Sequence, residues 1–160
     1  MENSNTGVQM EVLVTLLKFE DGWAPYFLRK WIQSDRADIA SRSIAMAAKY
    51  KVRDIVPDLL AILKTRVIFK SDFQKNEEII AALGRIGDTG AIPTLEKLAK
   101  NAGLFHQEEQ LHMKLGLYAS LEGYPLDAVS KLLKIGQRSK EQSIRDVCRK
   151  TLTGTNPCSH

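Results

Sequence analysis

A short pattern recurs along this chain with a period of roughly 35 residues, and such a period constrains the fold more than any other feature. It is clearest in Ile86–Leu95, which reads Ile-Gly-Asp-Thr-Gly-Ala-Ile-Pro-Thr-Leu. The glycines favour a tight turn, and a proline is tolerated in the first turn of a helix, where its missing N–H costs little. Similar helix starts carry Pro57 and Pro25, and Ser130 takes the proline position in a fourth copy. The pattern predicts helices that begin at regular intervals.

Between these starts lie segments whose apolar residues have helical spacing. The last segment places Ile144, Val147, Cys148 and Thr151 at i, i+3, i+4 and i+7, which is one face of a helix. Small residues such as Gly84 are expected where one helix closely approaches its neighbour. Because no helix pair can bury its apolar face alone, neighbouring pairs should stack around a continuous core. Leucines of the helices with proline-type starts should lie inside this core, namely Leu59, Leu95 and Leu132.

Polar residues mark two of the helix starts. Ser71 with Gln74, and Ser139 with Gln142, have the spacing of capping boxes. No segment shows the alternating pattern of a strand, so the sequence predicts an all-α fold. The nine expected helices span residues 8–19, 23–33, 37–50, 54–66, 72–86, 91–101, 107–122, 125–137 and 139–152.

The string Ala81–Pro93, Ala-Ala-Leu-Gly-Arg-Ile-Gly-Asp-Thr-Gly-Ala-Ile-Pro, resembles a HEAT repeat of the short bacterial, PBS-lyase-like kind. The resemblance implies a right-handed α-solenoid with the proline-bearing helices on its convex side and the Ala-Leu-Gly helices on its concave side. The family's favoured arginine is matched by Arg145, whereas Ala40 takes that place in the first pair. The expected single domain, 1–152, comprises a half repeat at 8–19 and helix pairs at 23–50, 54–86, 91–122 and 125–152, followed by a flexible tail at 153–160.

Charge is unevenly distributed along the chain. The net charge is +4, from 23 basic and 19 acidic residues. Residues 29–70 carry 10 basic and 4 acidic side chains, residues 71–130 carry 5 and 9, and residues 131–160 carry 7 and 2. Basic patches attract anionic surfaces, although in helical proteins they are commonly solvated faces.

Cysteine content and the N-terminal segment indicate a cytoplasmic protein without a membrane partner. The two cysteines, Cys148 and Cys158, do not make a disulfide framework. The apolar stretch Val8–Phe19 contains two charged residues and is too short to span a bilayer. No basic leader precedes it.

Reactive side chains do not converge in the sequence, which predicts a protein that is not an enzyme and has no cofactor. His106 and His112 flank two glutamates, but histidines six positions apart do not share a helix face as a metal pair does. No His-Glu dipeptide occurs, so the resemblance to HEAT-type iron hydroxylases does not extend to activity. Cys148 is expected in the core, and Cys158 has no local base to activate it. The glycines Gly84, Gly87 and Gly90 fit helix packing and a turn, not a phosphate loop.

Aromatic side chains cluster near the N-terminus at Trp23, Tyr26, Phe27 and Trp31. Core packing is the favoured interpretation, and an exposed docking patch at the end of the array is the alternative. The run Val67–Phe69 is expected to cover the link between two helices, and contact with a ligand is the alternative.

The leading functional hypothesis is a protein-binding module without catalytic residues or metal. The HEAT resemblance implies that a partner with an acidic or mixed-charge surface binds exposed positions of the concave helices. Small residues lie beside them at Ala45, Ala81 and Gly116, and arginines can pair bidentately with carboxylates. The implied positions are Lys18, Arg42, Lys49, Glu78, Arg85, His112 and Lys150.

The alternative hypothesis is a nucleic-acid-binding protein or a HEAT-like DNA glycosylase. The basic segments permit it, but the net negative middle of the chain and the tryptophans on an expected convex helix disfavour it. A bilin-lyase role is suggested by the name of the family alone.

Overall fold

The computed structural model describes residues 3–19, 22–63, 70–100 and 107–154, and these residues form helices and short connections without a strand. Nine α-helices were predicted, and nine occur in the described ranges. None of them is long and apolar enough to cross a lipid bilayer. The α-helices are α1 (Asn3–Lys18), α2 (Ala24–Ile32), α3 (Ala37–Lys49), α4 (Val56–Ile62), α5 (Lys70–Ile86), α6 (Ile92–Lys100), α7 (Gln107–Ser120), α8 (Leu126–Gln137) and α9 (Gln142–Gly154), with single 3-10 turns η1 (Arg53–Ile55), η2 (Thr89–Ala91) and η3 (Leu121–Gly123).

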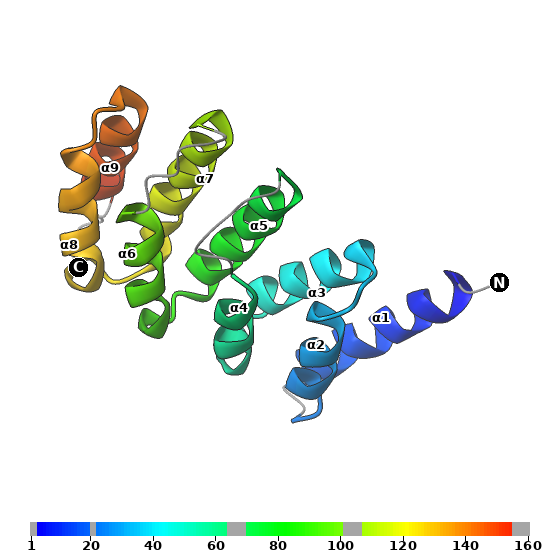
Figure 1. Cartoon of the computed structure of the whole chain (residues 1–160). Helices are drawn as coiled ribbons and strands as arrows, with labels where there is room; N and C mark the ends of the chain where they lie inside the picture. Colours follow the sequence, from blue (N-terminus) through cyan, green and yellow to red (C-terminus); the bar gives the residue numbers. More distant parts are fainter. Residues whose placement is uncertain (1–2, 20–21, 64–69, 101–106, 155–160) are drawn as a thin grey trace.

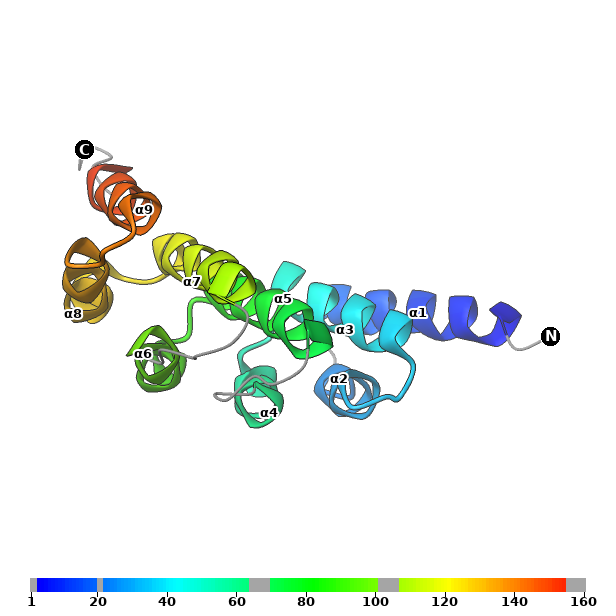
Figure 2. The same ribbon diagram turned by 45° about the horizontal axis from the view of Figure 1, so that its top comes forward.

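The helices are arranged in two rows that run along an elongated, open array (Figure 1). Helices α3, α5, α7 and α9 pack side by side in chain order, and we call them the inner row. Helices α2, α4, α6 and α8 form the outer row, which follows the longer path around the bend of the array (Figure 2). Helix α1 packs against α2 at one end. Stacking in chain order is what the repeated pattern predicts.

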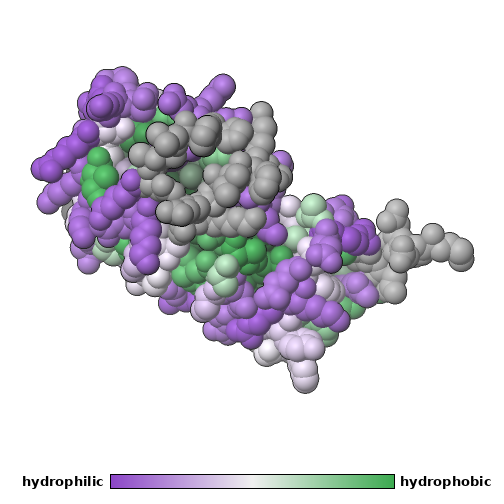
Figure 3. Space-filling view, in the orientation of Figure 1, coloured by the Kyte–Doolittle hydropathy of each residue, from purple (hydrophilic) through white to green (hydrophobic). Residues whose placement is uncertain are grey.

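One hydrophobic core connects the rows from α1 to α9. The leucines predicted to be interior are buried: Leu59 and Leu95 are 0% exposed and Leu132 is 1% exposed. Hydrophilic side chains cover much of the face seen in Figure 3, and hydrophobic side chains gather near its centre. The core therefore extends along the array instead of closing into a compact bundle.

Polar contacts link successive helices within each row. In the outer row, Arg29 of α2 donates from Nε to the Asp58 carboxylate of α4 at 2.9 Å. Further along, the Lys131 ammonium of α8 lies 3.0 Å from the Glu96 carboxylate of α6. Both pairs are partly exposed, so each contributes little to stability beyond fixing the relation of two neighbouring helices.

The repeated turn has the conformation that its glycines predict. Gly87 ends α5 with φ at 70°, in the left-handed region that favours glycine, and its N–H donates to the Leu83 carbonyl at 2.9 Å. The Asp88 carboxylate then accepts from the Gly90 N–H at 2.8 Å. Pro93 occupies the second position of α6, as Pro57 does in α4.

Glycines also allow a close approach between α5 and the end of α7. A Cβ built on Gly84 would lie 2.6 Å from Ser120 Cβ, and one built on Gly123 would lie 1.8 Å from the Gly84 carbonyl oxygen. The prediction that Gly84 packs against a neighbouring helix is confirmed.

Several expected boundaries differ from the structure. Helix α1 begins at Asn3 instead of residue 8, α4 ends at Ile62 instead of residue 66, and α9 continues to Gly154. Residues 153 and 154, predicted as the start of a flexible tail, are therefore helical, and residues 155–160, with Cys158, lie outside the described residues. Helix α5 includes Lys70, so Ser71 lies within it and is not its N-cap.

The capping box predicted at Ser139 is not formed. Ser139 Oγ accepts from the Glu141 N–H at 3.2 Å, and α9 begins later, at Gln142. The Gln142 amide donates to Asp146 at 2.8 Å instead of reaching back to the backbone of Ser139. The turn is held by Arg145, which donates to the carbonyl oxygens of Ser139 and Lys140 at 2.6 and 2.8 Å. The Arg145 guanidinium thus stabilises the turn that the Ser139 side chain was expected to cap.

The aromatic cluster is divided between core and surface. Phe27 and Trp31 pack against the core as predicted. Trp23 and Tyr26 are 63% and 56% exposed, so the expectation of core packing is wrong for them. Trp23 is the N-cap of α2, and Tyr26 lies within this first outer-row helix, which no earlier outer-row helix covers among the described residues. The run Val67–Phe69 lies outside the described ranges.

Candidate partner-binding surface

Each inner-row helix buries one stripe of residues and exposes the opposite stripe. Helix α3 buries Ala40, Ile44 and Ala47, and exposes Arg42 and Lys49. An offset of 36 residues relates this helix to α5, which exposes Ala81 and Arg85 in the same register. The exposed stripes face away from the paired outer helices, and we call them together the inner surface.

On α3 and α5, three exposed cations of the inner surface have no ion-pair partner within the described parts of the chain: Arg42, Lys49 and Arg85. The Lys49 ammonium lies 5.6 Å from the centroid of the Tyr50 ring, a cation–π contact that leaves it accessible. The small residues Ala45 and Ala81 lie beside these cations. The surface therefore presents accessible positive charge with little side-chain bulk between the charges.

Two predicted site residues are already engaged by neighbouring helices. The Ser41 hydroxyl of α3 donates to the Glu78 carboxylate of α5 at 2.7 Å. His112 Nδ1 of α7 lies 2.9 Å from the Glu77 carboxylate of α5. Both contacts join adjacent inner-row helices, so Glu78 and His112 help to set the spacing of the surface, and a partner would compete with these bonds.

The remaining two predicted residues belong to α1 and α9, the helices at opposite ends of the array (Figure 1). Lys18 is the last residue of α1, where it lines a hollow of about 480 Å³ together with Met10 and Met46. Lys150 is exposed on α9. The seven predicted residues therefore form an extended track over several helices and do not converge on one point.

The described ranges contain no group of side chains that could hold a metal ion. His112 lines a cavity of about 360 Å³ with Glu77, Glu108 and Glu109, but these described side chains are not arranged so that three of them could hold a metal ion. His106 lies outside these ranges. Cys148 is fully buried as predicted, and burial raises the pKa of its thiol to about 11, which disfavours the nucleophilic thiolate.

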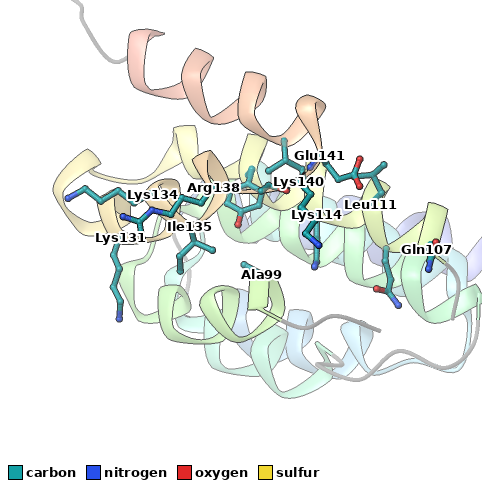
Figure 4. Close-up of a pocket in the computed structure, with 14 residues that line it drawn as sticks. Ala99, Gln107, Leu111, Lys114, Lys131, Lys134, Ile135, Arg138, Lys140 and Glu141 are labelled. Carbon is teal, nitrogen blue, oxygen red and sulfur yellow. Dashed lines mark hydrogen bonds between the residues drawn. The ribbon is translucent and has the colours of Figure 1, made fainter. Parts of the chain in front are cut away.

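Sequence reasoning missed a second feature, a cleft of about 990 Å³ at the edge of the array where α7 begins and α8 ends (Figure 4). We call it the basic cleft. It lies on the side of α7 away from His112. The excess of basic residues from Lys131 onward was a signal for the basic cleft, but it did not reveal that residues of α7 also line the cleft. The charged lining residues are Lys114, Lys131, Lys134, Arg138, Lys140 and Glu141.

Comparison of the chain with protein-family models, with curated proteins and with solved structures found no significant match.

Proposed function

We propose that this chain is a non-catalytic interaction module, built as a right-handed α-solenoid of HEAT-like helix pairs, that holds a partner protein on its inner surface. The observation that carries the proposal is the repetition of an exposed stripe: Ala45 and Lys49 on α3 are matched in register by Ala81 and Arg85 on α5. These positions do not contribute to the core. A repeated, uncommitted stripe is suited to binding an extended partner.

The charge of the inner surface favours a partner segment with acidic or mixed charge. Arg42 and Arg85 can each bind a carboxylate with two parallel hydrogen bonds, a geometry that lysine cannot provide. Ala45 and Ala81 allow the partner backbone to approach between the cations. A buried reduced thiol at Cys148 is in keeping with action in the cytoplasm.

Charge reversal tests whether the inner surface binds the partner. The triple variant Arg42→Glu, Lys49→Glu and Arg85→Glu should lose the partner in a pull-down from the native cell extract, because carboxylates would then face carboxylates. A matched control reverses three exposed outer-side cations that have no ion pair among the described residues, Lys30, Arg53 and Lys97. This control variant changes the net charge of the protein by the same amount as the inner-surface variant.

The control should retain the same captured protein as the wild type. Circular dichroism of both variants verifies that the helices remain folded. Equal loss in both variants would show that net charge, and not the inner surface, determines capture. Retention in the inner-surface variant would refute the proposal.

A further inference from the structure

The basic cleft is built from four helices and one turn. Helix α6 contributes Ala99, α7 contributes Lys114, α8 contributes Ile135, α9 contributes Ile144, and the turn before α9 contributes Arg138 and its neighbours. Most of these residues are labelled in Figure 4. Arg145 fixes this turn by its two bonds to backbone carbonyls. The shape of the cleft is therefore set by the packing of these helices and this turn, and not by the conformation of a single exposed side chain.

Basic side chains outnumber acidic ones in the described lining of the basic cleft. Five lysine or arginine side chains line it and one carboxylate, that of Glu141, accompanies them. Lys131 shares Glu96 with Lys100. The other four cations, Lys114, Lys134, Arg138 and Lys140, form no ion pair within the described parts of the chain. Clustered like charges repel one another, so an anionic ligand would relieve this repulsion.

Lys114 is the most informative of these cations, because it is half-buried. It lies on the same side of α7 as Leu111 and Tyr118, and desolvation lowers the pKa of its ammonium group. Its side chain extends into the cleft in Figure 4. An ammonium held partly away from water without a counter-charge is unfavourable, and a bound carboxylate would compensate it.

Apolar surface makes up the rest of the lining. Leu111, Ile135 and Ile144 contribute to it, beside the buried ring of Tyr118. Burial raises the pKa of the Tyr118 phenol to about 12, so the phenol stays neutral at physiological pH. A ligand that fills the cleft must therefore bring an apolar group as well as negative charge.

The distribution of charge indicates an extended ligand. In Figure 4, Lys131 and Lys134 lie at one end of the cleft, and Lys114 and Lys140 lie farther along it. A single phosphate would need donors that converge on one point, whereas spaced cations suit several carboxylates along a chain. The lining presents no exposed aromatic ring on which a base could stack, which disfavours a single-stranded nucleic acid.

We propose that the basic cleft binds a peptide segment of a partner protein that carries several carboxylates around an apolar side chain. The site lies apart from the inner surface, so it gives the module a second point of attachment. Two sites on one chain can raise the overall affinity for a partner that engages both.

Fluorescence anisotropy with synthetic peptides tests the proposal on the full chain. The probe is a labelled peptide of aspartates and glutamates flanking a central Leu-Phe pair, and a second peptide replaces that pair with Gly-Gly. The wild type should bind the first peptide about tenfold more tightly than the second, since burial of two apolar side chains provides at least that factor. A labelled single-stranded oligonucleotide serves as the competing class of ligand.

Two variants separate binding from folding. Lys134→Glu with Arg138→Glu should weaken binding of the Leu-Phe peptide by about tenfold or more, whereas Lys30→Glu with Arg53→Glu, an equal change of charge at exposed residues outside both proposed sites, should weaken it by less than about threefold. Lys114→Met should also weaken binding several-fold while the thermal stability stays equal or rises, because an unpaired, half-buried charge is removed. A purely structural role for Lys114 would instead lower stability.

The proposal is overturned if neither peptide binds, if the Gly-Gly peptide binds as well as the Leu-Phe peptide, or if the oligonucleotide binds more tightly than both. Equal losses in the cleft variant and the Lys30→Glu, Arg53→Glu control would also overturn it, because they would indicate attraction by net charge alone. These outcomes are independent of the pull-down on the inner surface, so the two proposals can fail separately.

Discussion

Two helical glycines with opposite surroundings provide a sharp test of how the array is packed. Replacing a glycine by alanine inside a helix gains about 1 kcal/mol from helix propensity when the methyl group meets nothing. Gly116 of α7 is such a position, because no atom lies within 4 Å of a Cβ built there. We therefore expect Gly116→Ala to stabilise the protein by about 1 kcal/mol.

At Gly84 of α5 the same methyl group would collide with the neighbouring segment. It would lie 2.6 Å from Ser120 Cβ and 2.7 Å from the Ser120 carbonyl oxygen, and neither atom can move aside by a change of rotamer. Overpacking of this kind costs roughly 1–3 kcal/mol, and backbone obstacles favour the upper part of that range. After the gain in helix propensity, Gly84→Ala should destabilise the protein by about 1–2 kcal/mol.

Urea unfolding followed by circular dichroism measures both variants. The two free energies of unfolding should differ by about 2–3 kcal/mol, with opposite signs relative to the wild type. Amide hydrogen exchange should also quicken in α7 and η3 of the Gly84→Ala protein, because the junction with α5 is loosened. If Gly84→Ala were as stable as Gly116→Ala, the close approach between α5 and the end of α7 would be refuted.

Three further predictions follow from the core and its surroundings. Leu95→Ala should lower the free energy of unfolding by about 2–5 kcal/mol in the same urea assay, because a fully buried side chain is removed, and an unchanged value would contradict its burial. In a Cys158→Ser background, Cys148 should react with a thiol reagent at pH 8 only after unfolding, and rapid reaction of the native protein would contradict a pKa raised to about 11. Hydrogen bonds from Lys100 and Lys131 lower the pKa of Glu96 below its usual 4.5, so its contribution to stability is present above that pH and is lost as the pH falls through the lowered value. The stability difference between wild type and Glu96→Gln should accordingly shrink below about pH 4.5 in pH-dependent melts, and a constant difference would count against the interaction.

The sequence was sufficient for features that depend on local backbone chemistry. The turn at Gly87 and the helix starts at Pro57 and Pro93 were predicted because glycine and proline restrict the backbone wherever they occur. Burial of Leu59 and Leu95 followed from helical periodicity, since one face of each helix must be apolar. These signals are contained within a few neighbouring residues.

Features that depend on contacts between distant segments were missed. Trp23 and Tyr26 have the composition of core residues, but their burial depends on whether another helix covers α2. The bonds from Ser41 to Glu78 and from Glu77 to His112 join separate helices, and no spacing in the sequence predicts them. The exposed stripes of the candidate site were predictable from the sequence, whereas the hydrogen bonds that join these stripes to neighbouring helices were not.

The basic cleft illustrates the same limit. Lys114 belongs to a segment with an excess of acidic residues, so composition alone assigns it to a negative region. Folding places it beside Lys134 and Arg138, which come from a later helix and turn. The net charge of a sequence segment therefore does not reveal a cluster of basic side chains that come from several helices.

Photo-crosslinking tests the central claim, that the inner surface contacts the partner, most directly. A photoreactive amino acid is placed in turn at Ala45 and Ala81 of the inner row and at Ala61 of outer helix α4, three exposed alanines. Irradiation in the native cell extract should link the same partner protein to Ala45 and Ala81 and leave Ala61 without it. A crosslink to that partner at Ala61, with none at Ala45 or Ala81, would contradict the account.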